Sequence, residues 1–352
     1  IIVNLSKTGE DEITYILETP NHNTGNLITN IAKICGVSRT TVHRALNNTG
    51  RISEKTKRMI LETAEKNGYR PDLLATGLAK GKTYYIGVVV MDVNNRYFSQ
   101  MLSALEIEAR ERGYFINITL HQNDKEIEKE QLCKLADYHV DGIILSSVNK
   151  GEEYKKFIES LNIPVVTIDN KIADKIPFVT VNGRSAISKA VCEIAESGYE
   201  KVIFVCPPLA EKNLENIYVH EERTAGFKEA VKKIHGLEYV IIGNWDYQKQ
   251  AKKELEKSEK KTAFLCTGDM FALNLIRMFE KNGKHAGQDY GIMGYDNIDF
   301  LEYVTPRLTT IDNHVEKVAE EAFNLLLQLM ENKNVAETER ILETVTVQGE
   351  TI

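Results

Sequence analysis

From residue 84 onward, short apolar runs alternate with amphipathic helical segments, and this alternation constrains the fold more than any other feature of the chain. Runs that are β-branched and almost continuously apolar are typical of parallel strands buried on both faces. Four of them come first: Tyr85–Met91, Tyr114–Leu120, Gly142–Ser146 and Pro164–Ile168. Helical patterns separate them at about 97–112, 126–137 and 152–161. This repetition predicts a doubly wound parallel α/β sheet.

A second series of the same kind follows the first. Its predicted strands lie near 178–181, 201–206, 238–242, 262–267 and 290–295, with helices between them. Two such series predict two α/β subdomains. Because ligands of these sheets bind beyond the carboxyl ends of the strands, two facing sheets form a cleft for a small molecule.

The residues after the first predicted strand are suited to line that cleft. Asp92 and Asn94 come directly after it, with Tyr97 and Phe98 beside them. Short polar groups can bond hydroxyls, and aromatic faces stack on the C–H surfaces of sugars. Tyr97 and Phe98 are also compatible with a plain core role, in which they only pack.

A helix-turn-helix pattern occupies Ile31–Asn47, with a turn at Gly36 and a second helix opened by Ser38. On this second helix three apolar side chains share one face at i, i+3 and i+4: Val42, Ala45 and Leu46. The opposite face carries Arg39, Thr40, His43 and Arg44. A helix of this kind suits the DNA major groove, so the pattern predicts a DNA reader.

A third helix is predicted from the N-cap Ser53 to Asn67, because Asn67–Gly68 is a typical stop signal. Residues 72–80 then predict a short, weak helix. Gly77 in its interior costs about 1 kcal/mol relative to Ala, and an isolated helix of this length is unstable. We expect this segment to fold only when another structure holds it.

The overall charge of −7 hides an uneven distribution. Residues 28–82 carry eleven Lys and Arg against four acidic residues, a net charge of +7. Most of the opposite charge therefore lies in the long α/β region. A basic head on an acidic body indicates that one end meets phosphates while the body does something else.

Several functional classes are disfavoured by the sequence. The five cysteines are scattered, with no pair or cluster at metal spacing, which favours reduced thiols in a cytoplasmic protein. There is neither an apolar run long enough for a transmembrane helix nor a secretory signal in residues 1–26, to which we assign no role. Nucleophile elbow, P-loop and GxGxxG motifs are absent. We expect no enzymatic activity, no metal and no cofactor.

Head and body together resemble a known family. The head has Ile31-Ala32, Gly36-Val37-Ser38, Thr41-Val42, Arg44 and Asn47, continuing through Ile52-Ser53, Lys55-Thr56, Gly68-Tyr69 and Pro71. The body has Arg223-Thr-Ala-Gly-Phe227, Gly243-Asn-Trp-Asp246, Gly294-Tyr-Asp296 and Pro306-Arg-Leu-Thr-Thr-Ile311. With these residues the chain resembles the lactose-repressor/galactose-repressor family over residues 28–352. Its body is similar to periplasmic sugar-binding proteins.

The resemblance implies roles for the head. Base edges would be read by Arg39, Thr40, Arg44 and, less securely matched, His43, and phosphates would be held by Ser38, Thr41 and Asn47. Leu78 matches a hinge leucine that wedges into the minor groove at the centre of a pseudo-palindromic operator, although it could also pack on the body. Two such hinges require a homodimer. The family usually begins its first helix with a Thr cap, but this chain has Leu27 there, so Asn26 or Thr29 would have to replace it.

The resemblance also implies an effector site. The matched positions are Asp169, Arg223, Asp296 and Asn313, with Asp269 close by and Trp245 at the rim. Gly268 stands where the family often has Asn, so one ligand hydrogen bond is lost. A sugar is the expected effector, while a nucleoside or purine stays compatible with these residues. The C-terminal residues carry no leucine heptad, which favours a dimer over a tetramer built on a C-terminal bundle.

The expected organisation follows from these observations. An N-terminal extension (1–26) precedes a helix-turn-helix domain (27–70), a hinge helix and linker (71–83) and an effector-binding body (84–352). In the body, the N-subdomain takes about 84–181 and 315–340, and the C-subdomain about 182–311 and 341–352. The expected function is a ligand-responsive transcriptional repressor. The alternative is a sugar-binding protein of a transport system, which has no use for a basic head.

Overall fold

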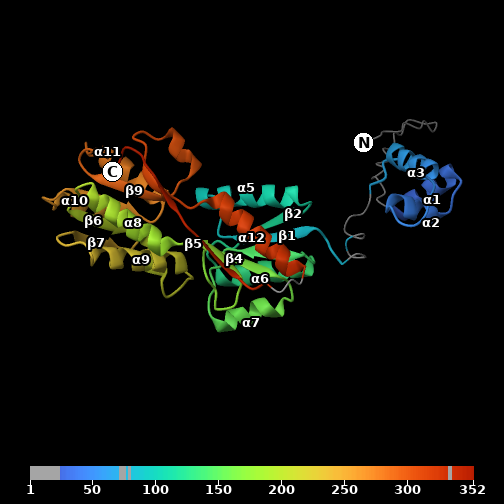
Figure 1. Ribbon diagram of the computed structural model, residues 1–352, viewed down its shortest axis with the longest axis horizontal. Helices are drawn as coiled ribbons and strands as arrows, with labels where there is room; N and C mark the ends of the chain where they lie inside the picture. Colours follow the sequence, from blue (N-terminus) through green and yellow to red (C-terminus); the bar gives the residue numbers. More distant parts are fainter. Residues whose placement is uncertain (1–23, 71–76, 78–80, 332–334) are drawn as a thin grey trace, which may run out of the picture. The chain divides into compact units, whose positions relative to one another are not determined.

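The computed structural model describes residues 24–70, 77, 81–331 and 335–352, with the side chains of 24–26 left aside. The chain divides into two compact units, residues 1–83 and 84–352 (Figure 1). Leu78 lies outside the described residues. None of the helices in the described part is long and apolar enough to cross a membrane.

The described part of the first unit contains the helices α1 (Thr24–Cys35), α2 (Arg39–Leu46) and α3 (Glu54–Lys66). Their apolar faces meet in a small core: Ile31, Ala32, Val42, Ala45, Ile60 and Ala64. The predicted N-caps are confirmed, because Ser38 Oγ accepts from the Thr41 amide and Ser53 Oγ from the Thr56 amide. The predicted start of α1 is wrong. This helix begins at Thr24, so neither Asn26 nor Thr29 is its N-cap.

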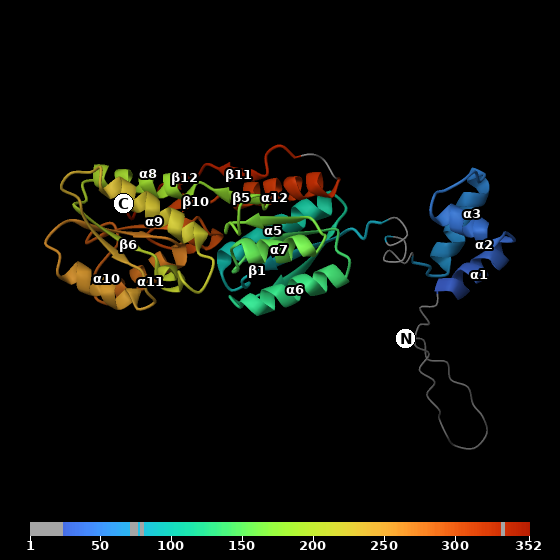
Figure 2. The ribbon, with the colours of Figure 1, turned by 90° about the horizontal axis from the view of Figure 1, so that it is seen from below.

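The second unit contains two six-stranded sheets. The first has the order β11-β5-β4-β3-β1-β2, and every pair in it is parallel. Its strands are β1 (Tyr85–Val90), β2 (Phe115–Leu120), β3 (Gly142–Leu145), β4 (Val165–Ile168), β5 (Phe178–Val181) and β11 (Glu339–Leu342). One face packs on α5 (Arg96–Glu111) and α12 (Val315–Met330), the other on α6 (Lys125–Asp137) and α7 (Glu152–Ser160) (Figure 2).

The second sheet has the order β12-β10-β9-β8-β6-β7, and β12 pairs antiparallel with β10 at its edge. Its strands are β6 (Lys201–Val205), β7 (Glu238–Ile242), β8 (Thr262–Cys266), β9 (Gly291–Asp296), β10 (Thr309–Asp312) and β12 (Val345–Val347). One face packs on α8 (Gly183–Glu196) and α9 (Tyr218–Val231), the other on α10 (Tyr247–Glu256) and α11 (Asp269–Glu280). Two short 3₁₀ helices, η1 (Pro207–Glu211) and η2 (Asp299–Tyr303), flank this sheet.

The predicted fold class is confirmed: an all-α head precedes two doubly wound parallel-sheet subdomains. We call the first sheet with its helices the N-subdomain and the second the C-subdomain. The chain passes between them after β5, after β10 and after β11. The strand at 178–181, which the strand pattern groups with the second series, pairs with β4 in the first sheet, within the residues expected for the N-subdomain. Local pattern identifies a strand, whereas the crossovers decide which sheet it joins.

Candidate functional site

The helix α2 presents the polar side chains predicted to read DNA. Arg39, Thr40, His43 and Arg44 are all exposed, while Val42 and Ala45 on the opposite face are buried. Arg44 lies against Gly50, where a Cβ atom would come within 3.2 Å of the Arg44 Cδ. Gly50 also has a φ of +73°, which disfavours other residues. The turn after α2 thus leaves room for the stem of Arg44.

The three residues predicted to hold phosphates have structural roles at the ends of α2. Ser38 Oγ lies 2.9 Å from Thr41 Oγ1 and caps the N-terminus of the helix. Asn47 Nδ2 donates at 2.9 Å to the His43 carbonyl oxygen, which also accepts from the Asn47 backbone amide at 3.0 Å. These bonds fix the two ends of α2.

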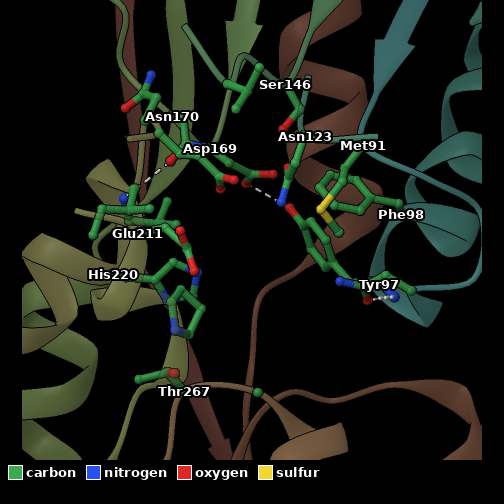
Figure 3. Close-up of a pocket in the computed structure, with 18 of the residues that line it drawn as sticks. Met91, Tyr97, Phe98, Asn123, Ser146, Asp169, Asn170, Glu211, His220 and Thr267 are labelled. Atoms are coloured by element: carbon green, nitrogen blue, oxygen red, sulfur yellow. Dashed lines mark hydrogen bonds between the residues drawn. The ribbon is translucent and has the colours of Figure 1, made fainter. Parts of the chain in front are cut away.

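In the body, a cavity of about 440 Å³ opens between the two subdomains (Figure 3). Its volume lies in the range of about 300–1,000 Å³ that is typical of small-molecule sites. Seven residues predicted to contact the effector line it: Asn94, Tyr97, Phe98, Asp169, Arg223, Trp245 and Asp296. Trp245 is 56% exposed, as expected for a residue at the rim.

Arg223 on α9 is the charged centre of the cavity, with only 6% of its surface exposed. Its Nη1 donates to the Thr267 carbonyl oxygen at 2.8 Å, and its guanidinium lies 3.6 Å from the centroid of the Tyr295 ring. Among the described residues none accepts a hydrogen bond from Nε. The stacked, partly satisfied guanidinium is pre-oriented to donate to a ligand.

Two carboxylates stand at the ends of strands, one in each of the two sheets. Asp169 follows β4 and accepts a hydrogen bond from Tyr97 Oη at 2.7 Å. Asp296 ends β9 and accepts from Asn313 Nδ2 at 2.7 Å. Both have positive φ angles, 63° and 113°, so the chain turns sharply at each. Such strain at non-glycine residues is typical of functional sites.

Burial shapes the electrostatics of the cavity. It raises the pKa of Asp169 to about 6, against the opposing effects of the Tyr97 hydrogen bond and of Arg223. It also raises the pKa of Asp296 well above the ordinary range. His220 behaves in the opposite sense, since burial and then Arg223 lower its pKa to about 3. His220 is therefore neutral. A ligand hydroxyl that donates to Asp169 or Asp296 stabilises the ionised form of that carboxyl group.

Three predicted residues do not line the cavity, and each makes hydrogen bonds within the protein instead. Asp92 Oδ1 accepts from the amides of Asn94 and Asn95, both at 2.8 Å. Asp269 is fully buried and accepts from Thr310 Oγ1 at 2.5 Å and from the Ile298 amide at 2.9 Å. Asn313 is the partner of Asp296. In this structure they support the lining residues, and their contact with the effector stays a prediction.

The cavity also includes residues that the sequence analysis missed. His121 and Ser146 come directly after β2 and β3, and Asn170 comes two residues after the end of β4. The rule that ligands bind beyond the carboxyl ends of strands could therefore have identified them. His121 Nε2 lies 2.9 Å from the Ser146 carbonyl oxygen, and His121 Nδ1 accepts from the Asn123 amide. Asn216 and His220, at the start of α9, carry no comparable signal in the sequence.

One ion pair joins the subdomains beside the cavity. Arg96, the first residue of α5, donates through Nε to Asp299 Oδ1 at 2.6 Å, and its second donor also contacts the same carboxylate. The Asp299 amide donates to Gln100 Oε1 at 3.3 Å. About half of each charged side chain is exposed. The contact therefore joins α5 to η2 at the surface.

Comparison with known proteins matches both parts of the chain. Residues 27–72 match the bacterial regulatory proteins of the lacI family, and residues 191–352 match the periplasmic binding protein-like domain. Catabolite control protein A of Priestia megaterium is 30% identical over 318 residues, which cover 88% of this chain and 93% of that protein.

Two solved structures share the fold. The lac repressor dimer bound to operator and the anti-inducer ONPF has a TM-score of 0.79 at 22% identity, over 91% of this chain and 97% of that one. A periplasmic binding protein/LacI transcriptional regulator from Alkaliphilus metalliredigens, complexed with D-xylulofuranose, has a TM-score of 0.66 at 25% identity, over 76% and 98%. The matches favour a regulator over a transport protein. The chain belongs to the lacI family of bacterial regulatory proteins and is a ligand-responsive, DNA-binding transcriptional regulator.

Proposed function

We propose that this protein is a repressor that binds a pseudo-palindromic operator as a homodimer and responds to a sugar held between its subdomains. The observation that carries the proposal is the pairing of an exposed polar helix α2, on a basic head, with a charged cavity in the body. A regulator has to reach the chromosome, so the proposal places it in the cytoplasm. The proposed role is binding, without catalysis.

On the DNA, Arg39, Thr40, His43 and Arg44 are proposed to contact base edges in the major groove. A bidentate Arg contact to guanine is worth about 1–3 kcal/mol of discrimination. Ser38, Thr41 and Asn47 are proposed to position the helix on the phosphates. Leu78 is proposed as the minor-groove wedge, which would unstack the central base step and kink the duplex. The likeness to an operator-bound lac repressor dimer supports this arrangement.

In the cavity, Asp169 and Asp296 are proposed to accept hydrogen bonds from vicinal hydroxyls, while Arg223 donates to another. Aromatic side chains at Tyr97, Phe98 and Trp245 would stack on the ring. The D-xylulofuranose bound to a relative supports a sugar. A nucleoside is the second candidate, because the neutral imidazole of His220 lines the cavity and can form hydrogen bonds with a base.

The experiment has two arms, one for DNA and one for the effector. Operator sites are selected from random duplexes with the full chain, and affinity is then measured over a salt series. A steep decline of affinity with salt is expected, because Lys and Arg displace counterions from the phosphates. A flat salt dependence without a selected site would favour the transport alternative. A thermal-shift screen with sugars and nucleosides identifies the effector, since a ligand of the native state raises the midpoint of unfolding.

A further inference from the structure

A fully buried carboxylate lies behind the wall of the cavity. Glu128 on α6 has no exposed surface. Its Oε1 accepts from Ser147 Oγ at 2.7 Å, from Tyr154 Oη at 2.5 Å and from Asn149 Nδ2 at 3.1 Å. Its Oε2 accepts from the Val148 amide at 2.7 Å. Glu128 thus accepts four hydrogen bonds, three at Oε1 and one at Oε2.

A fully buried carboxylate requires hydrogen-bond partners that are held in place. A buried ion without partners loses several kcal/mol of solvation, and the donors must replace water for it to stay charged. Hydrogen bonds to an ionised acceptor are also roughly twice as strong as neutral ones. Three of the donors belong to consecutive residues, Ser147 to Asn149. Glu128 therefore fixes the conformation of one loop.

That loop forms part of the effector cavity. Ser146, Ser147 and Val148 all line it, directly after β3. The Ser146 carbonyl oxygen also lies 2.9 Å from the Nε2 of His121, another lining residue. Glu128 itself does not line the cavity. It acts on the lining through the loop.

The same loop is bonded to the other subdomain. Asn216, only 4% exposed, donates its amide to the Val148 carbonyl oxygen at 2.9 Å. Asn216 Nδ2 donates to the carbonyl oxygens of Asn149 at 3.0 Å and of Lys171 at 3.1 Å. The helix α9 begins two residues later and carries His220 and Arg223. The buried Asn216 thus connects this loop to α9, the helix that carries Arg223.

We propose that Glu128 is a positioning residue for the effector site: it fixes the Ser146–Asn149 loop, and through Asn216 it sets the placement of α9 and Arg223 against the N-subdomain. This inference rests on the proposed function, in which the effector binds between the subdomains. It predicts that disturbing a carboxylate in the N-subdomain loosens the start of a helix in the C-subdomain.

The test is hydrogen exchange of the ligand-free full chain, comparing wild type, Glu128→Gln and a matched control. The amides that report are those of Val148, Asn216 and Val219, the last of which donates to Asn170 Oδ1 at 3.3 Å. The control is Leu132→Ala, a fully buried residue on the same helix that weakens packing without removing a donor or acceptor. Exchange is compared at denaturant concentrations that equalise global stability.

Glu128→Gln is expected to speed exchange at Asn216 and Val219 about tenfold more than Leu132→Ala does. Equal rates in the two variants, or faster exchange confined to α6 and the loop, would overturn the proposal. Should Glu128→Gln fail to fold, Ser147→Ala removes one donor and is expected to give the same pattern with smaller amplitude. Because no effector is used, failure of this test is distinct from failure of the proposed function, which is read from ligand and DNA titrations.

Discussion

Replacing Asp169 by Asn tests whether the charge arrangement of the cavity destabilises the folded body. Burial raises the pKa of Asp169 to about 6, compared with an ordinary value near 3.9. A shift of about two units corresponds to roughly 3 kcal/mol at 1.36 kcal/mol per unit, and partial exposure of the side chain makes this an upper bound. Asn keeps an oxygen that accepts from Tyr97 Oη and carries no charge.

The sign of the effect follows from proton linkage. Between the unfolded and the folded pKa, the folded protein binds more protons, so its stability falls as pH rises. The penalty is absent below about pH 4 and complete above about pH 6. Asp169→Asn is therefore expected to stabilise the body by about 1–3 kcal/mol at pH 8 and by much less at pH 4.

The assay is denaturant unfolding followed by the fluorescence of Trp245, the single tryptophan of the chain, which lies in the body. Asp174→Asn is the matched control. Asp174 is exposed in the same subdomain, and a hydrogen bond from Lys171 lowers its pKa, so its replacement should give no gain. A loss of stability in Asp169→Asn at pH 8, or a gain independent of pH, would refute the reasoning.

Three further predictions concern other parts of the chain. Arg44→Ala is expected to lose about 1–3 kcal/mol of specific operator affinity, with little change on a scrambled duplex in the same gel-shift titration. Ser53→Ala removes the N-cap of α3 and should lower the stability of the head by about 1 kcal/mol in a circular-dichroism melt. Gly226→Ala places a Cβ atom 2.1 Å from the Arg184 carbonyl oxygen, between α8 and α9. It is expected to destabilise the body by about 1–3 kcal/mol or more, and an unchanged unfolding midpoint would contradict the packing described.

The features that the sequence predicts correctly are those that depend on residues close together in the chain. The strands and the N-caps Ser38 and Ser53 follow from side-chain patterns within a few residues. The sheet to which Phe178–Val181 belongs depends on other parts of the chain, because this strand pairs with β4 and β11. Patterns of this length cannot report such long-range choices.

The candidate site shows the same division. Asp169 and Asp296 follow strands and line the cavity, as the rule on strand ends predicts. Asp269 and Asn313 also lie near strand ends, but their side chains bond to the protein and hold its loops. Asn216 was missed because its importance comes from contacts with the other subdomain. Residue type and position predict that a polar side chain lies near the site. Only the fold shows whether that side chain lines the cavity or bonds to the protein behind it.

The exposed Arg96–Asp299 ion pair has a practical consequence for any salt titration of this protein. Dissolved ions screen exposed charges, and such pairs contribute little once ionic strength is high. Added salt therefore weakens DNA binding and, at the same time, weakens the ion pair between α5 and η2 beside the cavity. A titration meant to count phosphate contacts thus also acts on a contact beside the cavity. The same titration with Arg96→Gln, in which this ion pair is absent, separates the effect of salt on DNA binding from its effect on the ion pair.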